Sequence, residues 1–98
     1  LIPQLWVGNL PLNQATEEAV VEALTRALYD NKVVAEGEET GIDHCTVRPK
    51  PEKTCGSWAL IDFKEVNAMY RTLALKTKVS LPDENGVMVV LDMRQSEM

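Results

Sequence analysis

The sequence predicts an α+β fold in which a four-stranded antiparallel sheet packs on two helices, in the order β-α-β-β-α-β. Strand-like and helix-like hydrophobic periods alternate along the chain in that order. The 98 residues are 45% apolar and 26% charged, a mixture that can bury one core but not two. We therefore expect residues 1–98 to form a single domain, cut from a longer protein, with no membrane-spanning segment.

The first half of the chain predicts a strand, a helix and a long loop. Residues 5–10 are a short apolar and aromatic run that ends in a Gly-Asn turn signal before Pro11, which indicates a strand. Thr16 is a helix-capping residue followed by two glutamates, and apolar residues then recur at helical spacing over residues 16–29. Residues 30–42 are polar and acidic without a sustained period, so we expect a connection.

The second half predicts two strands, a helix and a last strand. Residues 44–48 alternate in polarity and end at the prolines of 49–51, which cannot donate the amide hydrogen bonds of a sheet. Residues 56–63 have the strongest strand pattern, and residues 64–75 have helical spacing. After a polar turn, residues 87–91 are apolar or β-branched and are predicted to be the fourth strand of the sheet.

This order predicts a ferredoxin-like sandwich with one sheet face covered by helices and the other open. Side chains alternate along strands, so the apolar parity assigns the open face. The expected outward positions of the two central strands are Trp6, Gly8, Trp58, Leu60 and Asp62. Two exposed indoles on one face are suited to stacking on unpaired RNA bases. The alternative is that one indole turns into the core.

The neighbouring strands are expected to complete an RNA-binding face. The predicted RNA-binding residues beyond the two tryptophans and Leu60 are His44, Thr46, Arg48, Lys53 and Arg94. Arg48 and Lys53 are placed to contact phosphate or, for the arginine, to stack on a base. The alternative is that they belong to a solvated basic turn.

The last strand and the overall charge argue against tight RNA binding. Parity places Met88, Val90 and Asp92 outward and Val89 and Leu91 inward. Asp92 repels phosphate, and the formal net charge of −5 opposes the electrostatic attraction that dominates nucleic-acid binding. We therefore expect weak binding by this domain alone, made useful by a neighbouring domain tethered to the same strand.

Two segments resemble the signatures of the RNA recognition motif family. Residues 5–10, Leu-Trp-Val-Gly-Asn-Leu, are similar to its RNP2 hexamer, and residues 56–63 partly resemble its RNP1 octamer. The resemblance implies base stacking at Trp6, Trp58 and Leu60. Gly56 stands where the octamer usually begins with a basic residue, which removes one expected phosphate contact.

Within that family the sequence is most similar to the first motif of the large subunit of the splicing auxiliary factor that reads the polypyrimidine tract. The similarity lies in the helix start at 16–19, the long connection at 30–42, and the stretches 63–66 and 73–75. It implies binding of pyrimidine-rich single-stranded pre-mRNA, a role in splicing with other splicing-factor proteins, and a nuclear location.

Two competing functions start from the same topology. A protein-binding domain would dock a partner or a neighbouring domain on the apolar sheet face, although residues 75–86 lack the Arg-x-Phe element of one such variety. An acylphosphatase-like enzyme would need a glycine-rich phosphate loop with an arginine after the first strand, and residues 8–11 contain no arginine. We therefore expect binding rather than catalysis.

Neither a metal nor a cofactor is expected. Cys45 and Cys55 have no Cys-x-x-Cys spacing, and His44 is the single histidine of the chain. We expect both cysteines to be reduced and structural.

Overall fold

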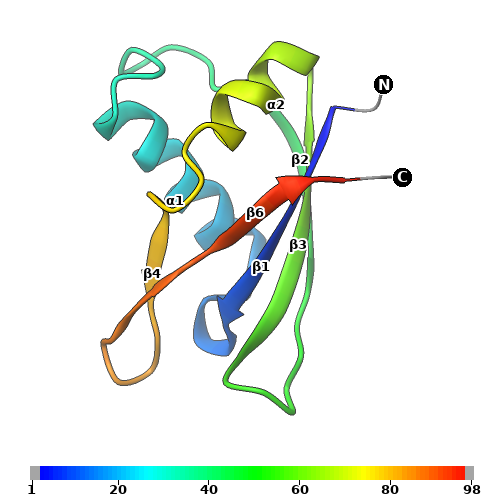
Figure 1. The fold of residues 1–98 in the computed structure, drawn as a ribbon, viewed down its shortest axis with the longest axis vertical. Coiled ribbons are helices and arrows are strands. Elements are labelled where there is room, and N and C mark those ends of the chain that lie inside the picture. The colour runs from blue at the N-terminus through cyan, green and yellow to red at the C-terminus, as the bar shows by residue number, and fades with distance from the viewer. Residues whose placement is uncertain (1–2, 97–98) are drawn as a thin grey trace.

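The computed structural model describes residues 3–96, so the first two and last two residues of the predicted domain lie outside it. Along the chain the elements are β1 (Gln4–Pro11), a 3-10 turn η1 (Leu12–Gln14), α1 (Glu17–Asp30), β2 (Ile42–Arg48), β3 (Cys55–Phe63), α2 (Val66–Leu73), β4 (Ser80–Pro82), β5 (Met88–Val90) and β6 (Asp92–Gln95). One antiparallel sheet has the order β2-β3-β1-β6, and β4 pairs with β5 separately. Both helices lie on one side of the large sheet (Figure 1), which confirms the predicted α+β, ferredoxin-like fold.

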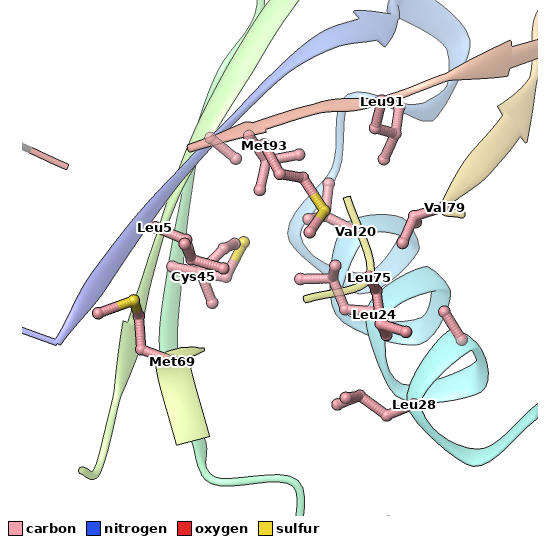
Figure 2. Close-up of a cluster of buried hydrophobic side chains, with 14 of the residues drawn as sticks. Leu5, Val20, Leu24, Leu28, Cys45, Met69, Leu75, Val79, Leu91 and Met93 are labelled. Carbon is pink, nitrogen blue, oxygen red and sulfur yellow. The ribbon is translucent and has the colours of Figure 1, made fainter. Parts of the chain in front are cut away.

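One hydrophobic core fills the space between the sheet and the helices. The inward residues of the two central strands, Leu5, Val7, Ala59, Ile61 and Phe63, are all buried, as the parity predicts. In Figure 2 the side chains of Leu5, Cys45 and Met69 lie toward one side of this core and those of Val20, Leu24 and Leu28 toward the other. Burial of this one face fixes which side chains each strand presents to solvent.

The helices begin and end for identifiable local reasons. Thr16 caps α1, since its hydroxyl accepts a hydrogen bond from the amide of Ala19 at 3.2 Å. Helix α2 is shorter than the predicted 64–75, because its last residues tighten into turns in which the Leu75 amide donates to the Thr72 carbonyl at 3.0 Å. Leu75 remains buried although it lies outside the helix. Among residues 3–96, no helix combines the length and apolar character that crossing a bilayer needs.

The position predicted for the last strand is wrong. Residues 88–90 pair with β4 in a hairpin, and β6 takes the fourth place in the sheet. The reason lies in β1, where Asn9 has a φ of 62° and turns the chain after Gly8, whose partner Asp92 ends the β1–β6 ladder. Beyond that pair, the Asn9 side chain donates to the carbonyl of Val90 at 2.9 Å instead of continuing the sheet.

The place of β6 beside β1 decides which residues share the open face. Met88 and Val90 are 58% and 49% exposed, but they lie on the hairpin rather than on the sheet. Leu91 is buried as expected, and the alternation continues into β6, where Asp92 and Arg94 are exposed. The last strand therefore contributes one acid and one base to the open face, and less apolar area than predicted.

The C-terminal end of the connection 31–41 is hydrogen-bonded to α2. Arg71 donates to the carbonyl oxygens of Glu39 and Thr40 at 3.2 and 2.9 Å. Lys64 also hydrogen-bonds to the carboxylate of Glu39, and this contact lowers the pKa of Glu39. Gly41 has a φ of 84°, and a Cβ placed there would lie 2.5 Å from the Cβ of Ala68.

Cys45 is a buried thiol in the middle of β2. Burial, followed by the negative charges of Glu17 and Asp62, raises its pKa to about 11 from the ordinary 9.0. Because burial disfavours the thiolate, the stability that the neutral Cys45 contributes is complete below pH 9 and is lost as the pH rises toward 11.

We expect Gly41→Ala to destabilise the fold more than Gly37→Ala. Both glycines have positive φ, at a cost of roughly 1–2 kcal/mol for alanine, but only Gly41 has a neighbour within 4 Å of the added methyl group. Overpacking against Ala68 should add about 1–3 kcal/mol. Urea unfolding of the two variants measures the difference, and equal losses would show that the contact is unimportant.

The stability of the protein should fall between pH 9 and pH 11 in a way that depends on Cys45. In Cys45→Ala the ionising group is absent, so the free energy of unfolding should decline less over that interval than in the parent chain. Urea titrations at closely spaced pH values measure the two slopes. Parallel slopes would assign the alkaline instability to other groups.

Candidate nucleic-acid interface

Side chains on the open face lie in rows that follow the register of the paired strands. The middle row consists of Thr46, Leu60, Trp6 and Arg94. Nearer the β2–β3 turn, Arg48 lies opposite Trp58 and Gly8 lies opposite Asp92, with a register shift between β1 and β3 at this level, and the row on the other side contains His44, Asp62 and Gln4. Trp58 is the diagonal neighbour of Trp6, a relation that places the two residues roughly 7–8 Å apart, within reach of aromatic side chains.

Trp6 lies along its own strand, over Gly8. A Cβ placed on Gly8 would overlap the benzene end of the indole, so the ring occupies this position only because residue 8 has no side chain. The guanidinium carbon of Arg94 lies 4.2 Å from the centroid of the Trp6 ring, within cation–π distance. Arg94 therefore covers one face of the indole, and Trp6 is half-buried.

Arg94 is shared between the indole and an acid. Its Nη2 lies 3.7 Å from Oδ2 of Asp92, and both side chains are more than half exposed. An exposed pair of this kind contributes little to stability. Arg94 is therefore able to exchange these contacts for a ligand without a large cost to the fold.

Comparison of the whole chain with solved structures identifies the architecture. The RNA recognition motif of Rna15 with bound RNA (GU) superposes with a TM-score of 0.63 at 14% identity, covering 100% of this chain and 86% of that one. A second structure of the Rna15 motif gives a TM-score of 0.62 at 16% identity, with 97% and 90% coverage. The chain has the RNA recognition motif fold. No protein-family model matches it, and none of the curated proteins matches it in sequence.

The RNA recognition motif fold brings most of the predicted site residues together. Thr46, Leu60, Trp6 and Arg94 are neighbours in one row, and Arg48 lies opposite Trp58 in the next. His44 is on the same face but lies opposite Asp62, away from both indoles. Both tryptophans and Leu60 are half-buried, so neither indole has turned fully into the core.

Lys53 reaches the site from the β2–β3 turn. Its methylene chain lies across Gly56, where an added Cβ would be 2.8 Å from its Cδ. The lysine thus covers the position at which the resembled octamer usually begins with a basic residue. The next residue, Ser57, is buried. Its hydroxyl accepts a hydrogen bond from the Lys50 amide at 2.9 Å, which closes the β2–β3 turn.

One open-face contact escaped the sequence reasoning. The amide nitrogen of Gln4 donates to the carboxylate of Asp62 at 2.7 Å, while the amide oxygen of Gln4 is buried without a hydrogen-bond partner among the described residues. Gln4 is one position before the apolar run that predicted the strand, so only its even parity with Trp6 pointed to this face. The contact satisfies one carboxylate oxygen of Asp62, which lies opposite His44.

Within residues 3–96, no three His, Cys, Asp or Glu side chains gather closely enough to hold a metal ion. The chemistry that the open face offers consists of two indoles, an aliphatic side chain, several cations and two carboxylates. These groups suit stacking and hydrogen bonding.

Gly8→Ala should displace the Trp6 indole. The φ of Gly8 is not positive, so the backbone tolerates alanine, but the new methyl group and the ring cannot occupy the same space. In a Trp58→Phe background, the remaining emission from Trp6 should shift to the red as the ring becomes more exposed.

The control is Gly56→Ala in the same background, whose methyl group meets only the flexible chain of Lys53. That variant should keep the emission of its parent. An unchanged spectrum for Gly8→Ala would contradict the close packing of the indole on Gly8.

Proposed function

We propose that the open face binds single-stranded RNA by stacking bases on Trp6 and Trp58. The observation that supports this most directly is the presence of two half-buried indoles as diagonal neighbours on a sheet face that no other described element covers. Stacking on an aromatic ring contributes roughly 1–3 kcal/mol per base and needs no particular base edge. Leu60, opposite Trp6, supplies an apolar floor for the first base.

Arg94 takes part in this binding by changing partners. In the free protein its guanidinium occupies one face of the Trp6 indole. A base that stacks on that face displaces Arg94, which then becomes available for a phosphate or for the other face of the base. The exchange keeps the positive charge at the site while freeing the aromatic surface.

The remaining charges give weak, local attraction to the RNA backbone. Arg48 lies beside Trp58, Lys53 lies at the turn, and Arg94 lies beside Trp6. Asp92, opposite Gly8 and next to Arg94, offsets part of this charge. The proposed affinity of the isolated domain is therefore low, and neighbouring domains of the parent chain raise it by tethering.

Pyrimidine-rich pre-mRNA is the proposed substrate class, with a role in splicing and a nuclear location. The support is the resemblance of residues 5–10 and 56–63 to the RNP motifs and the similarity of the helix start and long connection to a polypyrimidine-reading motif. The Rna15 motif, which shares the fold, has been solved with RNA (GU) bound. Alternating guanosine and uridine is therefore the informative competitor for oligo-uridine.

Docking of a protein on the sheet face is the second candidate. This function would need an apolar last strand on the open face. Met88 and Val90 belong to the β4–β5 hairpin instead of the four-stranded sheet. The remaining apolar side chains on the open face are the two indoles and Leu60, which lies opposite Trp6 and two residues from Trp58 on β3. This small apolar area suits flat bases better than a broad protein surface. If this chain binds none of the RNA oligomers tested, protein docking becomes the better-supported function.

Trp6→Ala and Trp58→Ala should each weaken RNA binding by roughly 1–3 kcal/mol while leaving the melting temperature almost unchanged. Titration with short oligo-uridine, oligo-cytidine, oligo-adenosine and alternating guanosine-uridine, followed by tryptophan quenching and by anisotropy, measures the loss and the base preference.

Tyr70→Ala is the matched control, since Tyr70 is an exposed aromatic residue on α2, away from the open face. It should bind RNA as the parent does. Equal loss in all three variants, or no binding by the parent chain, would contradict stacking on the open face. Unfolding of a tryptophan variant would assign that indole to the core.

A further inference from the structure

A groove of about 940 Å³ lies between α1 and the edge strand β2, near the helix-covered side of the sheet. Its floor is apolar, since Val21, Tyr29 and Ile42 line it and pack against the core from their half-buried positions. The Tyr29 hydroxyl donates to the carbonyl oxygen of Glu38 at 2.9 Å, which ties the connection 31–41 to α1. The groove therefore has an ordered apolar floor that is open to solvent.

The charge around this groove is concentrated and negative. Six carboxylates line it: Glu17, Glu18, Glu22, Asp30, Glu36 and Asp43. Arg26 is the one arginine or lysine in the lining, and it is paired with Glu22 at 2.9 Å. Six carboxylates against one guanidinium give a formal charge of −5, which equals the net charge of the whole chain. The acidic excess of this protein therefore belongs to one groove.

One wall of the groove is a free sheet edge. β2 pairs with β3 on one side, and no strand in the described part of the chain pairs with its other side. Alternate residues of an edge strand direct their N–H and C=O groups away from the sheet, where an added strand can pair with them. Residues 42–45 belong both to β2 and to the groove lining.

These properties select one kind of occupant. Six carboxylates repel the phosphates of RNA, and a second copy of this chain would bring a second charge of −5 to the same place. A chain rich in lysine or arginine matches the rim, one apolar side chain matches the floor, and an extended backbone matches the edge. No described segment of the chain pairs with this edge of β2 and also brings cations to the acidic rim.

We propose that the groove between α1 and β2 binds a basic, extended peptide segment of a partner protein, which adds to the sheet beside β2. Its cations lie among the carboxylates of the rim, and an apolar side chain between them contacts Val21, Tyr29 and Ile42. The surface is separate from the indoles on β1 and β3, so the proposal does not depend on RNA binding.

The test uses the 98-residue chain and a fluorescein-labelled seven-residue peptide, Lys-Ser-Lys-Ser-Val-Ser-Lys, in which the lysines and the valine share one face when the peptide is extended. Anisotropy should show saturable binding that weakens as salt is added, because several exposed ion pairs contribute. Amide chemical shifts should change along α1 and β2 and stay constant at Trp6 and Trp58. The same peptide with a central proline should bind at least several-fold more weakly, because proline cannot donate to the edge.

The charge contribution is measured with a matched pair of double variants. Glu18→Gln with Asp43→Asn removes two charges from the rim and should weaken peptide binding about 3- to 10-fold, as expected for two exposed ion pairs. Glu52→Gln with Glu84→Gln removes two exposed charges outside the groove and should leave binding unchanged.

Three results would overturn the proposal. They are equal weakening by the two double variants, equal affinity for the proline-containing peptide, and displacement of the bound peptide by oligo-uridine. The first two would reduce the binding to general charge attraction, and the third would move the peptide to the open face. Loss of RNA binding in the tryptophan variants with intact peptide binding would separate the two surfaces.

Discussion

Burial of one face of β1 and β3 against the helices is the constraint on which the rest of the structure depends. These are the two central strands, and their inward residues form the middle of the core. A slip of one residue in either strand would exchange its two faces and bury polar groups. The same burial therefore holds Trp6 and Trp58 on the open face, although neither indole contributes a fully buried side chain.

The position of the Trp6 indole depends on the absence of a side chain at Gly8. Gly8 gives the indole a flat surface to lie on, and Arg94 covers the ring from the neighbouring strand. Asn9, with a positive φ, then shifts the register of β1, which goes on pairing with β3 while the β1–β6 ladder ends at Gly8. Gly8 and Arg94 thus determine the position of the indole, and Asn9 determines where the β1–β6 ladder ends.

Charge is divided between two surfaces rather than spread evenly. The groove between α1 and β2 has a formal charge equal to that of the whole chain, so the rest of the molecule is balanced. The net charge of −5 consequently says little about the open face, where Arg48, Lys53 and Arg94 lie close to the indoles. One domain can therefore present a face suited to RNA and an edge suited to a basic peptide at the same time.

The sequence by itself determined the order of the elements up to the second helix, the outward parity of Trp6, Trp58 and Leu60, and the Thr16 helix cap, because all of these depend on local periodicity and local hydrogen bonds. It misplaced the fourth strand, since apolar residues 87–91 favour a strand but do not say which partner it pairs with. The cover of Arg94 over Trp6, the Gln4–Asp62 contact and the acidic groove were decided by tertiary structure alone. Each joins residues far apart in the chain, and only the packed sheet sets their distances.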